Sequence, residues 1–150
     1  MAPPHVIDRD VFEAFLEVDS EHSRNISRDL IILYWSQAEK LLDTIAQKLC
    51  VYHKRWLSVA VLYVIPFFRS QNRLKSCDHD IRTLYDSAST FGITRVEDSC
   101  RTMELMFNQL SVVGADSNLL KIKRQMESLL VDLREAHLEA KRYLLDWYGI

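Results

Sequence analysis

The sequence is poor in residues that break helices and form tight turns. It contains three glycines and three prolines in 150 residues, whereas folds built from many short strands need such residues at regular intervals. Its three cysteines include no CxxC pair, which argues against a disulfide framework and a cysteine-based zinc site. The scarcity of turn residues therefore favours long helices, and we expect the cysteines to be reduced, buried thiols.

Charge and hydropathy also exclude several functions. The 19 Lys and Arg and 21 Asp and Glu residues give a net charge of −2, so the chain lacks the basic surface typical of nucleic-acid binding. The most apolar stretch, residues 56–68, has about 13 residues, fewer than the roughly 20 that a membrane span requires. Nothing at the N-terminus resembles a cleavable signal. We expect a cytoplasmic and nuclear protein that binds neither nucleic acid nor membrane.

The composition, with 48% hydrophobic and 27% charged residues, is that of a globular chain, and its length suits one domain over residues 1–150. Asp8 can cap a short first helix that ends near Asp19, with Ile7 and Phe12 spaced as a hydrophobic staple. The second helix should cover about residues 24–49. Its predicted core stripe is Ile26, Leu30, Tyr34, Ala38, Leu41, Ile45 and Leu49.

Two further helices are predicted after Gly92. Thr94 and Glu97 form a capping-box pattern that starts the first of them, and Gly114 ends it. The predicted stripes are Ile93, Val96, Cys100, Met103, Phe107 and Leu110 in the first, and Leu119, Ile122, Met126, Leu129, Leu133, Ala136, Ala140, Tyr143 and Trp147 in the second. His137 flanks the latter stripe and should be structural. The pattern predicts an all-α fold, an antiparallel four-helix bundle with a short N-terminal capping helix.

Several segments resemble the histidine-containing phosphotransfer (HPt) proteins of fungal type. Residues 6–19, 26–31 and 36–39 are similar to the opening of that family, residues 87–100 to the small-residue run and turn after its phosphoacceptor, and residues 130–149 to its closing helix. The resemblance covers about residues 6–49 and 79–149. The apolar segment 50–76 departs from it and is interpreted as an insertion, or as a gene-model artefact such as intron read-through. Pro66 should kink or break this segment.

The resemblance implies a component of two-component phosphorelays. In that family a histidine takes a phosphoryl group from an aspartyl phosphate in the pattern His-x-Leu-Lys-Gly, where the lysine offsets the incoming negative charge and the glycine leaves room for the partner. Mg²⁺ and the acidic pocket belong to the partner, so no cofactor is expected here. The implied partners are a response-regulator receiver domain and the receiver of an upstream hybrid histidine kinase, and we expect a monomer.

Two alignments with the histidine pattern are open. Counting back from Gly92 without gaps puts Arg82 at the histidine, Tyr85 at the lysine and Asp86 at the glycine. Because arginine stays protonated and has no free lone pair, this register predicts a pseudo-HPt protein that competes for receivers.

The second register makes His79 the phosphoacceptor. Arg82 is then the supporting cation and Thr83 the small residue, provided that three residues were inserted before Ser87. Three residues move the imidazole about 4.5 Å along the helix axis and about 60° around it. The alternative for His79 is that it is an ordinary solvated surface residue.

The family docks its receiver over the short first helix. By that resemblance Val11 and Phe15 are partner-binding anchors, and the alternative is that they pack against the end of the bundle. An alternative from another class is a structural bundle subunit that uses residues 56–68, including Leu57 and Val61, as its interface. We do not expect an enzyme. We also expect no metal site, because the adjacent Cys77, Asp78 and His79 do not make a ligand set.

Overall fold

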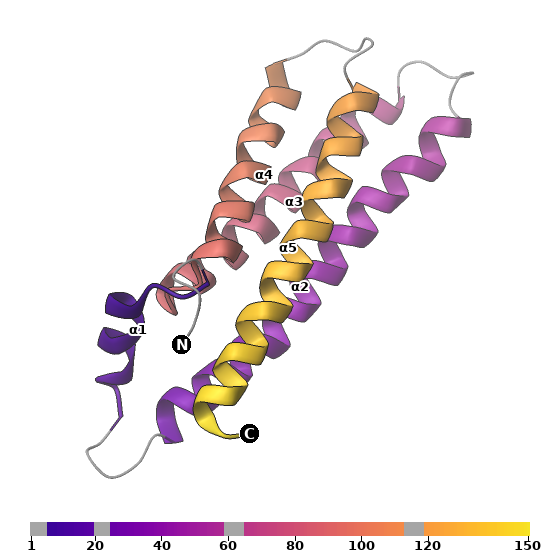
Figure 1. The fold of residues 1–150 in the computed structure, drawn as a ribbon. Helices are drawn as coiled ribbons and strands as arrows, with labels where there is room; N and C mark the ends of the chain where they lie inside the picture. Colours follow the sequence, from indigo (N-terminus) through magenta and orange to yellow (C-terminus); the bar gives the residue numbers. More distant parts are fainter. Residues whose placement is uncertain (1–5, 20–24, 59–64, 113–118) are drawn as a thin grey trace.

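Five helices and no strand make up the part of the chain that the computed structural model describes, residues 6–19, 25–58, 65–112 and 119–150, without the side chains of 50–58, 65–75, 109–112 and 119–123. The helices are α1 (Arg9–Leu16), α2 (Asn25–Ser58), α3 (Ile65–Thr90), α4 (Thr94–Val112) and α5 (Leu119–Tyr148). The four long helices alternate in direction, and each packs against two neighbours, α2 on α3, α3 on α4, α4 on α5 and α5 on α2 (Figure 1). The predicted all-α bundle is confirmed.

The short helix α1 begins at the predicted cap. The Asp8 carboxylate accepts hydrogen bonds from the backbone amides of Asp10, at 3.0 Å, and Val11, at 3.3 Å, which satisfies two of the free amides at a helix start. Ile7 and Phe12, the two residues of the expected staple, are both buried. Local sequence therefore fixes where α1 starts and which side of it faces the bundle.

The predicted core of α2 is correct from Tyr34 onward and wrong before it. Tyr34, Ala38, Ile45 and Leu49 are buried and Leu41 is partly buried, but Ile26 and Leu30 are 50% and 38% exposed. Ser27 and Ile31 are the buried residues of this turn. One position corresponds to about 100° around the helix. The buried face of this turn, which includes the polar Ser27, is therefore rotated by one residue from the face that the apolar residues predicted.

The stripes of the last two helices are largely confirmed. Ile93, which precedes α4, is buried, as are Val96, Cys100, Met103 and Phe107 of α4 and Met126, Leu133, Ala136 and Ala140 of α5. Leu129 and Tyr143 are partly buried, whereas Leu110, Leu119 and Ile122 lie outside the described side chains. The prediction that Trp147 belongs to the core stripe is wrong, since it is 43% exposed. Its ring nevertheless packs edge-on against Phe12 with 5.9 Å between centroids.

His137 lies inside the bundle rather than beside it. It is buried with its ring edge against Trp35, 5.1 Å between centroids, and near Tyr34. Neither of its ring nitrogens has a hydrogen-bond partner among the described residues. Burial lowers the pKa of His137 to about 4; the nearby Glu39 carboxylate raises it only in part, and Lys141 lowers it. His137 is therefore a neutral core residue at pH 7, as its predicted structural role requires.

The turn between α3 and α4 fastens α1 to the bundle. Gly92 has a φ of +68°, and the amide of Ile93 donates to the carbonyl of Ala88 at 2.9 Å while that of Gly92 donates to Ser89 at 3.1 Å, the Schellman pattern of a helix end. The Gly92 carbonyl in turn accepts from the amide of Asp8 at 2.7 Å. A backbone hydrogen bond thus attaches the start of α1 directly to the end of α3.

Helix α4 begins at Thr94, the predicted start, and its first turn contains Glu97. The amide of Glu97 donates to the carbonyl of Ile93 at 3.1 Å, and its carboxylate accepts from the Tyr85 hydroxyl at 3.1 Å. Glu97 therefore connects α4 to α3.

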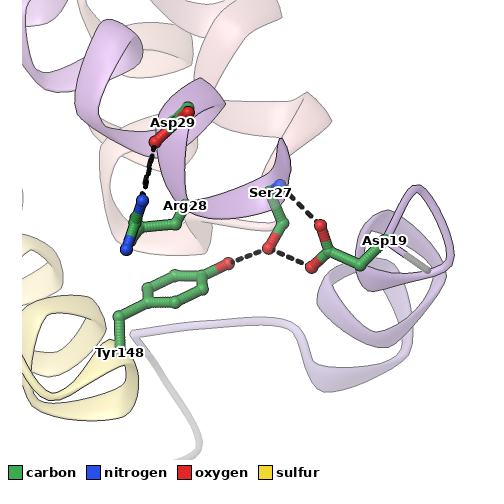
Figure 2. Close-up of polar contacts among 5 residues, drawn as sticks. All are labelled: Asp19, Ser27, Arg28, Asp29 and Tyr148. Atoms are coloured by element: carbon green, nitrogen blue, oxygen red, sulfur yellow. Dashed lines mark hydrogen bonds and ion pairs between the residues drawn. The ribbon is translucent and has the colours of Figure 1, made fainter. Parts of the chain in front are cut away.

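A hydrogen-bonded cluster of Asp19, Ser27 and Tyr148 joins three parts of the chain (Figure 2). The Asp19 carboxylate, which follows α1, accepts from the amide of Ser27 at 2.8 Å and from its hydroxyl. The Tyr148 hydroxyl, at the end of α5, donates to the Ser27 oxygen at 2.7 Å. This Asp19–Ser27–Tyr148 cluster explains why a serine is buried in α2, because its amide and its hydroxyl both have hydrogen-bond partners there.

The segment 50–76 extends both helices of the α2–α3 pair. Helix α2 continues to Ser58, past the predicted end at residue 49, and α3 begins at Ile65 with Pro66 in its first turn, where a proline needs no amide hydrogen. The proposed interface residues Leu57 and Val61 lie outside the described side chains. Within the described ranges, no helix is long and apolar enough to span a bilayer.

Candidate functional site

The outward face of α3 carries both residues that the two alignments single out. Cys77, Ile81, Leu84 and Ala88 are buried, and this spacing of three and four turns the residues between them toward solvent. His79 and Arg82 are both exposed. The structure therefore places both candidates on the surface, in one helix that runs without interruption from Ile65 to Thr90.

Arg82 is held by two carboxylates. Its guanidinium forms an ion pair with Glu104 of α4 and lies 3.7 Å from the Asp78 carboxylate one turn earlier in α3. The hydrogen bond with Glu104 and the nearby carboxylates raise the pKa of Arg82 above its already high ordinary value. Arg82 is thus a permanent cation that cannot act as a nucleophile.

His79 lies three residues before Arg82 on the exposed face of α3. Its backbone carbonyl accepts a hydrogen bond from the Thr83 hydroxyl at 2.9 Å. The residue two positions after each candidate, Ile81 or Leu84, is fully buried, as the apolar position of the family pattern should be. Burial therefore fits both registers, and the choice between them depends on the distance to the turn at Gly92.

Charged and polar contacts brace this face on both sides. Toward α2, Lys48 pairs with Asp80 and donates to the Ser76 carbonyl at 3.2 Å. Toward α4, the Tyr85 hydroxyl accepts from Arg101 at 3.0 Å, and the Arg101 guanidinium lies 5.8 Å from the centre of the Tyr85 ring. Tyr85 therefore bridges α3 and α4 at the position where the gap-free alignment expects a lysine.

Sequence reasoning missed Glu104 and Lys48 as members of the site. The Asp78 and Arg82 pair could have been read from its spacing of four residues. Glu104 and Lys48 come from other helices, at sequence separations of 22 and 32 residues from their partners, and no local pattern signals such pairs.

Helix α1 presents one of its two expected anchors. Val11 is 38% exposed. Phe15 is partly buried, and its ring stands edge-on to Phe91 with 4.9 Å between centroids. Phe91 also contacts Tyr34 of α2, at 5.0 Å. Val11 is therefore exposed to solvent, while Phe15 packs against the end of the bundle.

A second apolar surface lies on the first turns of α2. Ile26, Leu30 and Leu33 are 50%, 38% and 53% exposed, and their spacing of four and three residues aligns them on one side of the helix. The Asp19–Ser27–Tyr148 cluster and the contacts of Phe91 bring this part of α2 to the same end of the bundle as α1. We call Ile26, Leu30 and Leu33 the α2 stripe.

The cysteine thiols Cys77 and Cys100 are buried in the core. Burial raises the pKa of Cys77 and of Cys100 to about 12 in both cases, so neither thiol is a reactive thiolate at neutral pH. Cys50 lies outside the described side chains. Among the side chains that the structure describes, no group of three His, Cys, Asp or Glu residues is arranged to hold a metal ion.

Comparison with known families gives one match. Residues 29–141, from the early part of α2 to near the end of α5, match the Hpt domain. That range includes the whole exposed face of α3, with His79 and Arg82, and the turn at Gly92. No curated protein matches the chain.

Proposed function

Because the chain belongs to the Hpt domain family, we propose that it binds response-regulator receiver domains through the outward face of α3 without accepting their phosphoryl group. Hpt domains are phosphocarrier modules rather than catalysts, and membership involves the chain in phosphorelay signalling. The proposal makes it a pseudo-HPt protein, one that occupies the docking surface of a receiver and leaves the phosphoryl group in place.

The observation that carries the proposal is the location of Arg82. It lies ten residues before Gly92, which corresponds to about 15 Å along α3, and the helix between them is regular and ends in a regular Schellman turn. This register needs no insertion, whereas the register that makes His79 the phosphoacceptor needs three added residues. The gap-free register, with a guanidinium in place of the imidazole, is therefore favoured.

The docking surface is proposed to combine α1, α2 and α3. Val11 and the α2 stripe offer exposed apolar side chains at the end of the bundle where Gly92 holds α1. A specific interface buries about 800 Å² on each partner, enough to reach from α1 to a site about 15 Å away on α3. Exposed leucines beside a polar face with fixed charges are what such a docking patch requires.

The decisive experiment separates binding from transfer. The full chain is incubated with a receiver domain carrying radiolabelled aspartyl phosphate, and acid-labile label and complex formation are measured together. We expect a complex with the receiver and no label on the wild-type chain. The variant Arg82→His/Asp86→Gly, which restores the histidine and glycine of the family pattern, should acquire label because the imidazole then lies at the transfer position.

His79 supplies the competing outcome. Its imidazole is exposed and has the Arg82 cation one turn ahead, which is the arrangement of the second register. Label on the wild type that disappears in His79→Ala would show relay through His79 and contradict the pseudo-HPt assignment. Absence of any complex with receivers would contradict the proposed function as a whole.

The docking surface has its own test. We expect Leu30→Ala/Leu33→Ala to weaken receiver binding by more than about tenfold, since buried apolar anchors supply most interface energy. Val131→Ala/Leu138→Ala is the matched control, because these α5 residues are 56% and 49% exposed and lie outside the proposed surface. Equal effects of the two pairs, measured by isothermal titration calorimetry, would rule out the α2 stripe as the docking site.

A further inference from the structure

Among the described residues, the charges on the outward face of α3 and the adjoining sides of α2 and α4 are unequal. Described cations on it are Lys48, Arg82 and Arg101, and each is engaged with a carboxylate, Asp80, Glu104 and Glu97 respectively. Asp78 is a second carboxylate beside Arg82. Asp86 is exposed one turn after Arg82. Three cations thus stand against five carboxylates among the described residues.

The excess of negative charge is concentrated around Arg82 itself. Glu104 and Asp78 contact its guanidinium, and Asp86, four residues on, lies about 6 Å away between Cβ atoms. One positive charge therefore has three negative charges nearby, two in contact with it and one about a turn away. Since Coulomb energies add with their signs, a further anion arriving here meets net repulsion.

In the gap-free register, two departures from the family pattern change the site in the same direction. Tyr85 stands where the family has the lysine that offsets the phosphoryl charge, and Asp86 stands where it has glycine. The first change removes a cation and the second adds a carboxylate at the point where the partner approaches. A site altered in this way is unfavourable to a phosphoryl group, which carries roughly two negative charges.

We propose that this face makes the protein selective for unphosphorylated receiver domains, an inference that rests on the receiver binding proposed above. Docking brings Arg82, Asp86 and Glu104 against the pocket of the receiver, where phosphorylation adds negative charge. The carboxylates repel the phosphorylated form, while the apolar contacts of Val11 and the α2 stripe act on both forms alike. The protein then interferes with phosphorylation of the receiver and leaves the action of the phosphorylated receiver unaffected.

The test compares the two states of one receiver. A receiver domain that the chain binds is titrated with the full chain in the presence of Mg²⁺, with and without beryllium trifluoride, a stable mimic of aspartyl phosphate. We expect binding to the untreated receiver to be about tenfold tighter. The difference should shrink as salt rises from 0.15 M to 1 M, because the screening length falls from roughly 8 Å to roughly 3 Å.

Variants identify the groups responsible. Asp86→Asn keeps the size of the side chain and removes its charge, so it should reduce the preference several-fold, and Asp132→Asn, an exposed carboxylate of α5, should leave it unchanged. Equal binding of both receiver states, or tighter binding of the beryllium form through Arg82, would overturn the inference while leaving receiver binding intact. Binding to neither state would contradict the proposed function instead.

Discussion

Gly92 shows how one missing side chain determines the mounting of a whole helix. A Cβ at this position would lie 2.8 Å from the Asp8 carbonyl oxygen and 3.1 Å from the Val11 Cβ, and the φ of +68° is one that only glycine adopts at low cost. Both the conformation of the turn and its distance from α1 therefore require glycine.

Replacing Gly92 with alanine should separate these two requirements. We expect Gly92→Ala to lower the free energy of unfolding by about 2–4 kcal/mol, the sum of a strained left-handed residue and a clash with backbone. Gly149→Ala is the control, since Gly149 has the same φ but no atom within 4 Å of its Cβ position, and it should cost only about 1 kcal/mol. Urea denaturation measures both, and equal losses would mean that the clash with α1 is relieved without cost.

His137 should make stability depend on pH. Its pKa is about 4 in the folded protein and about 6.5 in the unfolded chain, so the unfolded chain binds the extra proton first as pH falls. Stability is therefore full above pH 6.5 and declines toward pH 4, by about 2 kcal/mol between pH 7 and pH 5. His137→Phe, which keeps an aromatic ring beside Tyr34 and Trp35, should flatten this slope in urea titrations, and an unchanged slope would assign it to other groups.

Single residues were predictable where the signal is local. Asp8 was identified as a cap from its neighbours, and Arg82 was identified from its spacing to Gly92. The partners of Arg82 and Asp80 were not, because Glu104 and Lys48 approach from other helices. The sequence thus identified the candidate position but not the charges that decide its chemistry.

At the scale of helices, the first turns of α2 show why periodicity can choose the wrong face. Apolar residues there follow two overlapping sets, Ile26, Leu30 and Leu33 on one side and Ile31, Tyr34 and Trp35 on the other. Both satisfy a helical repeat. The choice is made by Ser27, which is buried because Asp19 and Tyr148 bind it, and those contacts link segments that are distant in sequence.

The Asp19–Ser27–Tyr148 cluster should hold α1 to the rest of the bundle. We expect Tyr148→Phe to lose about 1 kcal/mol of stability, the net value of one hydrogen bond, and to speed hydrogen exchange at the amides of α1 more than at those of α4. Tyr143→Phe, on the same helix but outside the cluster, should do neither. Uniform acceleration of exchange over all helices would indicate general destabilisation instead of a local release of α1.

For the whole molecule, the described core includes parts of α2 and α3 on either side of the segment 50–76. Buried residues of α2 up to Leu49 and of α3 from Cys77 form one cluster with α4 and α5, and Lys48 joins the two helices at that level through Ser76 and Asp80. The segment 50–76, which extends α2 and α3, thus joins two helices whose described parts are held together by this core.

Shortening that extension should leave the fold intact. We expect replacement of residues 53–72 by a four-residue Gly-Ser connection to preserve a cooperative thermal transition and receiver binding, because adjacent helices are only about 8–10 Å apart. Circular dichroism and calorimetry on the shortened chain make the comparison with the full chain. A molten or insoluble product would show that the extension contributes core packing of its own.

Fold class and family were within reach of the sequence because they depend on many positions at once. The apolar repeats of the predicted long helices and the turn at Gly92 still identify the fold despite a local error such as the one in α2. The register of the phosphoacceptor depends on three residues, too few for a pattern to decide, and the regular course of α3 up to Gly92 supplied the argument for Arg82.

The two deeply buried thiols have a practical consequence. With their pKa raised to about 12, Cys77 and Cys100 can meet an alkylating reagent only when α3 or α4 moves away from its neighbours. Because they lie on separate helices, their alkylation rates report the local opening of α3 and of α4 separately. Mass spectrometry of the alkylated peptides would measure both rates without any engineered label.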